Sequence, residues 1–196
     1  VSCFRPINIE ATASASGDIT VSWSDTTSSS LWDVACVLAE EDPATSATLT
    51  TVTDTFVVFS GMAPSSIYKV YVRTNCGNEV SGWRFVTVLT PCAAITDLPW
   101  QTNFDLEGAG SNVFPHCWTK VTTYSGSYPY VFSVSHAPSA HNALRFYSST
   151  STYNIAVLPQ LDSTIDITTL QLTLKYYHTG SSYGSIGGMS NPNHAS

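Results

Sequence analysis

The sequence predicts an all-β protein, made of a seven-stranded two-sheet sandwich followed by an incomplete second β-sandwich. Residues that suit strands, such as Thr, Val, Tyr and Trp, are abundant, whereas good helix formers are sparse in every window. Short stretches alternate apolar and polar residues, which is the period of a half-buried strand. Turn signals rich in Gly, Pro, Asn and Asp separate these stretches.

The charge and the apolar content exclude several classes of protein. The 196 residues include 7 Lys+Arg and 14 Asp+Glu, which gives a net charge of −7. Nucleic-acid binding is not expected, because it needs a basic face. An apolar content of 43% argues against disorder. The sequence has no apolar run of about 18 residues, so no membrane span is expected.

Residues 1–92 contain the clearest strand patterns. Five stretches are expected to be strands: 18–24, 31–36, 55–59, 67–73 and 84–88. The inward residues expected in three of them are Ile19, Val21 and Trp23; Trp32, Val34 and Cys36; and Tyr68, Val70 and Val72. About seven short strands in about ninety residues are typical of a two-sheet sandwich.

Specific motifs accompany these strands. Val21-Ser22-Trp23 and Trp32-x-Val34 precede Gly61-Met62-x-Pro64-x-Ser66-x-Tyr68-x-Val70-x-Val72. Together they resemble a fibronectin type III domain over the whole of 1–92. The resemblance implies that Trp23 fills the core and that the Tyr68 hydroxyl caps a nearby turn as a tyrosine corner. A later pattern, which ends in Ser81-x-Trp83 and Thr90-x-Cys92, is similar to repeats in large secreted proteins of Gram-negative bacteria.

After a short connector at 93–98, the sequence of 99–196 changes character. Five motifs follow in order. They begin at Leu98-Pro99-Trp100, Pro115-His116-Cys117-Trp118, Ser139-x-His141-Asn142, Ala156-Val157-Leu158 and Leu170-x-Leu172-x-Leu174-x-Tyr176. This order resembles the jelly-roll domain of the MAM and cleaved-adhesin type, found in bacterial adhesins and secreted proteases. The resemblance implies about four further strands, so we expect only the N-terminal part of a jelly roll here, completed by a second chain or a missing segment.

The five cysteines favour an oxidising compartment. The fibronectin type III resemblance implies that the first strand begins at the end of the sandwich where the sixth finishes, so Cys3 and Cys76 can meet. Cys92 follows the last strand and is expected within reach of Cys117. We expect these two disulfides, with Cys36 left as a buried thiol. The alternative is that all five cysteines are reduced.

Aromatic residues in the second region are candidates for a sugar-binding surface. Aromatic faces beside Asn, Ser and Thr donors suit a neutral polysaccharide, which needs no charge for recognition. The alternative is that these rings pack in the core or at sheet edges, and the exposure of Tyr128 and Tyr130 distinguishes the two interpretations. The candidates are Trp118, Tyr124, Tyr128, Tyr130 and Tyr153.

A structural calcium ion is a second expectation drawn from the jelly-roll resemblance. Asp105 matches the position of an acidic ligand in such domains, Glu107 follows it, and the loop 139–142, including Asn142, offers further oxygens. Calcium needs about six to eight oxygen ligands, several from carboxylates. The resemblance places the remaining ligands in the missing half, so we do not expect a complete site, and no other cofactor is predicted.

The residues that could catalyse a reaction form no recognisable constellation. Gly180-Ser181-Ser182-Tyr183-Gly184 matches the G-x-S-x-G nucleophile pattern, which also needs a following helix and a downstream acid and His. Only His194 follows, without an acidic residue, so we interpret the match as chance. The five histidines lack zinc-site spacing.

These observations predict a non-catalytic adhesion or binding module of a secreted or cell-surface Gram-negative bacterial protein. Its partner would be a glycan or a host or surface protein, with the first domain as a spacer. Two alternatives remain: an ancillary region of a secreted protease or glycoside hydrolase whose catalytic domain is not in this chain, and a purely structural spacer.

Overall fold

The computed structural model describes residues 3–25, 29–46, 48–123, 125–135, 141–147, 149, 151–178 and 184–188. The chain divides into two compact units, Val1–Cys92 and Ala93–Ser196. As predicted, the structure is all-β. Its described helices are one short α1 (Pro43–Ser46) and the 3₁₀ turns η1 (Asp105–Glu107) and η2 (Ile167–Thr169). None of the described helices has the length and apolar character needed to cross a membrane.

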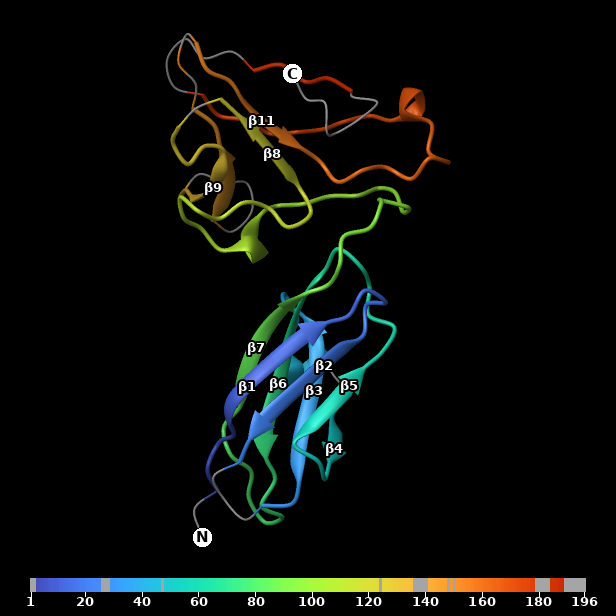
Figure 1. Cartoon of the computed structure of the whole chain (residues 1–196), viewed down its shortest axis with the longest axis vertical. Coiled ribbons are helices and arrows are strands. Elements are labelled where there is room, and N and C mark those ends of the chain that lie inside the picture. Colours follow the sequence, from blue (N-terminus) through green and yellow to red (C-terminus); the bar gives the residue numbers. More distant parts are fainter. Residues whose placement is uncertain are drawn as a thin grey trace. The chain divides into compact units, whose positions relative to one another are not determined.

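The first unit is a sandwich of two antiparallel sheets, which Figure 1 shows as β1 to β7. One sheet has the order β1-β2-β5 and consists of Ile7–Ala13, Ile19–Ser24 and Phe56–Phe59. The other has the order β4-β3-β6-β7 and consists of Thr50–Val52, Trp32–Leu38, Ile67–Thr74 and Arg84–Leu89. The seven predicted strands and their two-sheet arrangement are confirmed.

The core of this unit lies between the two sheets and follows the alternation of the sequence. Ile19 and Val21 of β2 are fully buried, and Trp23 meets Trp32 of β3 edge to face, with ring centroids 6.1 Å apart. Tyr68, Val70 and Val72 of β6 complete the same cluster. Burial of each large apolar side chain contributes about 1.5–3 kcal/mol, so this cluster dominates the stability of the unit.

Strand β3 departs from the predicted one-sided pattern. Asp33, Ala35 and Val37, which point away from the core, are also buried. Their cross-strand neighbours on β6 are Arg73, Tyr71 and Lys69, whose long side chains cover the smaller residues of this central strand. The outer face of this sheet is therefore a second packed layer.

Two further features of the first unit match the expectations. The Tyr68 hydroxyl accepts a hydrogen bond from the Ala63 backbone N–H at 3.1 Å, which is the predicted tyrosine corner. A disulfide joins Cys3 to Cys76, with the Cα atoms 6.1 Å apart and a sequence separation of 73. Closing a loop of this length stabilises a fold by about 4 kcal/mol in the chain-entropy account.

The described part of the second unit holds two separate antiparallel strand pairs. The first is β8 (Thr119–Thr122) with β11 (Asn154–Val157), and the second is β9 (Tyr130–Ser133) with β10 (Asn142–Arg145). Among the described residues these strands do not form the two facing sheets of a jelly roll. That part of the resemblance stays a prediction.

The alternation at Leu170, Leu172, Leu174 and Tyr176 is the pattern of a half-buried strand, but the described residues here form no strand. All of 170–178 is exposed and belongs to no strand. A strand needs a ladder of backbone hydrogen bonds, and the described part of the chain provides no neighbour for this one. The described residues 184–188 are likewise outside any strand.

Candidate functional site

Strand β9 and the two residues before it present a row of aromatic rings. Tyr128, Tyr130 and Phe132 occupy alternate positions, and alternate residues of an extended chain share a face. The ring centroids of Tyr128 and Tyr130 are 4.9 Å apart, and those of Tyr130 and Phe132 are 6.2 Å apart. Val131, between the last two, is fully buried on the opposite face and anchors the strand.

Strand β10 adds a cation and a further ring to this row. Arg145 lies opposite Tyr130 in the antiparallel register. Its guanidinium carbon is 4.6 Å from the centroid of Phe132 and 5.8 Å from that of Tyr128. Two residues later, the ring of Tyr147 lies 5.4 Å from that of Tyr128 and is 51% exposed. We call Tyr128, Tyr130, Phe132, Arg145 and Tyr147 the tyrosine–arginine surface.

The acidic residues of the second unit are occupied elsewhere. Each accepts a hydrogen bond from a residue outside the tyrosine–arginine surface: Asp97 from Thr96, Asp105 from Asn142, Glu107 from His116, Asp162 from Thr164 and Asp166 from Thr168. Among the described residues the ion pair is that of Arg73 with Asp33, in the first unit. The guanidinium of Arg145 therefore faces rings and solvent without a carboxylate partner in the described part of the chain.

The structure brings together only some of the predicted sugar-binding residues. Tyr128 and Tyr130 share the tyrosine–arginine surface and are partly buried, so neither ring is fully exposed. Trp118 belongs to a different cluster, with ring centroids 6.3 Å from Trp100 and 5.6 Å from Phe104. Tyr153 is 42% exposed and exchanges hydrogen bonds with Thr123. Tyr124 lies outside the described residues.

Three members of the surface were missed, namely Phe132, Arg145 and Tyr147. The sequence contains a signal for the first, because Tyr128-x-Tyr130-x-Phe132 continues the alternation along one strand face. Arg145 and Tyr147 join the surface through the pairing of β9 with β10, which spans a loop. Local periodicity carries no information on that pairing.

Of the residues proposed for calcium, Asp105 and Asn142 lie together. The Asp105 carboxylate accepts the backbone N–H of Asn142 at 2.9 Å and that of His141 at 3.3 Å. The Asn142 side-chain amide donates to the carbonyls of Phe104 and Gly108, both at 3.1 Å. These groups are therefore satisfied by one another, as a hydrogen-bonded tie between η1 and the start of β10.

Glu107 points to a different neighbour. Its carboxylate accepts the backbone N–H of His116 at 3.1 Å, and burial raises its pKa despite that hydrogen bond. The described residues around Asp105 thus offer one carboxylate, fewer than a calcium ion requires. Of the loop 139–142, the residues before His141 lie outside the described part of the chain. Calcium binding therefore stays a prediction of the sequence.

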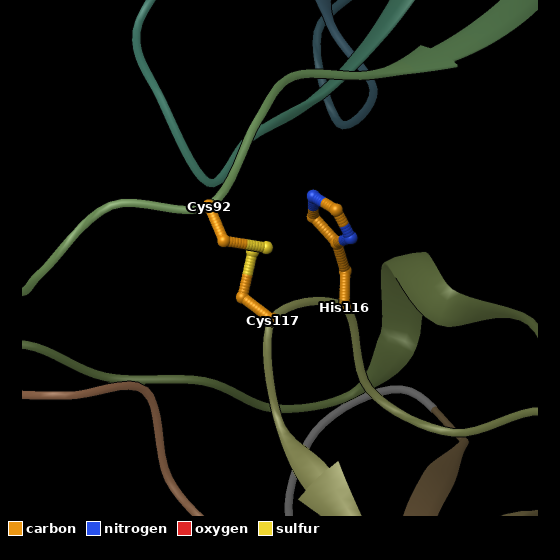
Figure 2. Close-up of side chains that lie close together, drawn as sticks. All are labelled: Cys92, His116 and Cys117. Carbon is orange, nitrogen blue, oxygen red and sulfur yellow. The ribbon is translucent and has the colours of Figure 1, made fainter. Parts of the chain in front are cut away.

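Cys92, His116 and Cys117 form a cluster that superficially resembles a zinc site, because one atom of each lies within 4.8 Å of the others. Figure 2 shows the sulfur atoms of Cys92 and Cys117 directed at one another, with the imidazole of His116 beside them. Both cysteines are disulfide-bonded, as predicted for this pair. Zinc is bound by thiolates, so the oxidised cluster lacks its sulfur ligands.

The remaining predicted features involve few described residues. Cys36 is the free thiol expected from the odd cysteine count, and burial raises its pKa to about 11. Of the G-x-S-x-G pattern, Gly180 to Tyr183 lie outside the described residues.

A second group of rings and cations lies on the outer face of the β4-β3-β6-β7 sheet. The guanidinium carbon of Arg73 is 4.5 Å from the ring centroid of Trp83, and Tyr71 packs against both Trp83 and Phe85. Here the Arg73 Nε atom donates to the Asp33 carboxylate at 2.9 Å. Asn75 and Thr51 donate to the other oxygen of Asp33 at 3.0 and 2.9 Å, so the charge of Arg73 is neutralised within the fold.

The chain was compared with family models, with curated proteins and with solved structures. No family model matches the chain, and no curated protein matches it. Similar solved structures include the chicken CNTN1 FN1–FN3 domains, with 18% identity over 44% of this chain and 30% of that chain, at a TM-score of 0.40. The fn3 domain of human collagen alpha-1(XX) has 20% identity over 50% of this chain and 93% of its own, at a TM-score of 0.42.

A third similar structure is an Fn3-like protein from Clostridium thermocellum, with 14% identity over 48% of this chain and 100% of its own, at a TM-score of 0.40. The chain therefore spans about a third of the length of the chicken protein but the full length of this bacterial one. With three strands facing four and a tyrosine corner in place, the first unit has a fibronectin type III-like β-sandwich fold.

Proposed function

We propose that this chain is a non-catalytic, glycan-binding part of a secreted or cell-surface bacterial protein, and that the tyrosine–arginine surface contacts the glycan. The observation that carries the proposal is the grouping of Tyr128, Tyr130 and Tyr147, with ring centroids about 5 Å apart on one side of a strand pair. The first unit serves as a spacer. Its disulfide, and that of Cys92 and Cys117, are compatible with an extracellular location.

Grouped tyrosines suit a sugar for two reasons. Their faces pack against the C–H groups of a pyranose ring, and their hydroxyls remain available to its hydroxyl groups. Each ring also has few rotatable bonds, so little conformational entropy is lost when a ligand binds. Tyr130 stands on β9 itself, and sites on strands are held more rigidly than sites on loops.

The test is binding of the full chain to a glycan array, followed by titration of the best ligand. The double variant Tyr128→Ala/Tyr130→Ala is expected to weaken glycan binding by about tenfold or more. The reason is that each contact between a tyrosine ring and a sugar ring contributes on the order of 1 kcal/mol. Tyr177→Ala is the matched control, because Tyr177 is 89% exposed and lies outside the surface. It should bind within about twofold of the parent. Far-UV circular dichroism verifies that both variants are folded.

Two results would contradict the proposal. If the double variant binds its best glycan as tightly as the Tyr177→Ala control, the surface is not the binding site. If the parent chain binds no glycan on the array, the spacer interpretation takes its place. The predicted completion of the second sheet by another chain or segment stays a prediction, and the alternating residues 170–176 are where such a strand would pair.

A further inference from the structure

We propose that the tyrosine–arginine surface selects glycans that carry a carboxylate, such as those containing uronic or sialic acids, with Arg145 as the residue that recognises the acid. The inference rests on the proposed glycan-binding function and replaces the expected neutral ligand with an acidic one. Composition had suggested a neutral ligand, because acidic and basic residues are scarce along the whole chain. The surface itself has a more specific electrostatic character.

Arg145 is held in a position suited to recognition. Its guanidinium lies over Phe132 at 4.6 Å and near Tyr128 at 5.8 Å, so contacts with the aromatic rings restrict its orientation. An arginine stacked in this way keeps N–H donors in the guanidinium plane, where they can form the paired hydrogen bonds that a carboxylate accepts. The side chain is exposed, so a ligand can reach those donors.

The local charge favours an anionic ligand. In the described part of the chain Arg145 has no ion-pair partner, and the five acids of the second unit accept hydrogen bonds elsewhere. A second cation lies nearby, because Lys120 donates to the carbonyl of Ser127 at 2.8 Å, one residue before Tyr128. Although the protein has a net charge of −7, this surface holds the cation Arg145 and no described carboxylate that would oppose an anion.

The combination of rings and guanidinium is what points to a sugar acid. A carboxylated pyranose offers a C–H face for Tyr128, Tyr130 or Tyr147 and, at the ring edge, a planar carboxylate for Arg145. The rings of Tyr130 and Tyr147 and the guanidinium of Arg145 each lie within about 6 Å of the Tyr128 ring, which is the size of one monosaccharide with its substituents. An inorganic anion would use Arg145 and leave the rings without a ligand.

The experiment is calorimetric titration of the full chain with two matched pairs of glycans. One pair is an oligogalacturonate and its full methyl ester, which keeps the same rings but removes the charge. The other pair is sialyllactose and lactose. At least one acidic member should bind about tenfold or more tighter than its neutral counterpart, which is the range expected for a charge-assisted hydrogen bond. The preference should decrease as salt is added.

Variants separate Arg145 from general electrostatics. Arg145→Gln should abolish the preference, so that the acidic member of each pair binds no tighter than its neutral counterpart. Lys175→Gln is the control, since it removes an equal charge from an exposed residue outside the surface. It should keep the preference intact.

The possible outcomes distinguish this inference from the proposed function. Equal binding of acidic and neutral members would overturn the acid selectivity and leave glycan binding standing. If the parent chain binds no glycan on the array or in the titrations, both the acid selectivity and the proposed glycan-binding function are wrong. If an acidic peptide of glutamates binds as tightly as the acidic sugars, and Tyr128→Ala/Tyr130→Ala does not weaken it, recognition is of charge alone and the sugar-acid assignment is wrong. Loss of preference in Lys175→Gln would also contradict the role of Arg145.

Discussion

The two units each place an arginine over aromatic rings, at nearly equal distances but with different surroundings. The guanidinium of Arg73 is 4.5 Å from the Trp83 ring, and that of Arg145 is 4.6 Å from the Phe132 ring. Arg73 donates to Asp33, a carboxylate whose side chain is only 7% exposed, whereas Arg145 is exposed and meets no described acid. The same pair of groups is therefore bound to a buried acid in the first unit, whereas in the second it meets no described carboxylate.

The difference arises from the layer beneath each arginine. In the first unit β3 is covered on both faces, so Asp33 is buried and needs donors, which Arg73, Asn75 and Thr51 supply. In the second unit the residue opposite Arg145 is Tyr130, which makes no comparable demand for charge compensation. Arg73 and Arg145 make similar contacts with aromatic rings. They differ in whether a neighbouring acid neutralises the guanidinium.

The largest expected effect is on the Arg73 side of the comparison. Asp33→Ala removes the acceptor shared by three donors and leaves a partly buried guanidinium without its partner. We expect the free energy of unfolding of the first unit to fall by about 3 kcal/mol. Urea denaturation followed by tryptophan fluorescence measures it. Asp54→Ala is the matched control, because Asp54 is an exposed turn residue. A loss of stability as small as that of the control would remove the basis of the comparison.

A smaller effect is expected on how the free energy of unfolding depends on pH under acidic conditions. Burial acts to raise the pKa of Asp33, but its hydrogen bonds to Asn75, Arg73 and Thr51 outweigh burial and hold the pKa below its usual value. A group whose pKa is depressed by folding contributes stability above its unfolded pKa, near 3.9, and this is lost as the pH falls through the folded pKa. Asp33→Asn should therefore show a flatter decline of stability below about pH 4 than the parent. If the free energy of unfolding of Asp33→Asn falls with decreasing pH as steeply as that of the parent, this prediction is wrong.

The sequence predicted the first unit in detail because its burial follows local alternation. Ile19, Val21 and Trp23 alternate with polar residues, so one sheet face could be assigned without knowledge of any partner strand. The burial of Asp33, Ala35 and Val37 was missed because the covering side chains come from β6, more than thirty residues away in sequence. The register between β3 and β6 places these side chains over β3, and local periodicity in the sequence does not predict that register.

The candidate site was only half predictable for the same reason. Tyr128 and Tyr130 belong to one strand, and their alternation is visible in the sequence. Arg145 and Tyr147 reach them through the pairing of β9 with β10. Trp118 was grouped with them on residue type alone, and it packs instead with Trp100 and Phe104. The alternating residues 170–176 show the converse limit, since a strand pattern forms a strand only where a partner strand is present.

The smallest expected effect on stability is on the Arg145 side. Arg145→Ala removes an exposed cation from two rings without leaving a buried acid behind, so the free energy of unfolding of the second unit should fall by at most about 0.5–1 kcal/mol. The measurement is urea denaturation, with unfolding monitored by tyrosine fluorescence or circular dichroism. A loss near that of Asp33→Ala would mean that Arg145 is a structural residue like Arg73, and that its exposure does not indicate a binding role. A small loss combined with abolished preference for acidic glycans separates the two arginines by function, because only a residue that is dispensable for folding leaves its donors to a ligand.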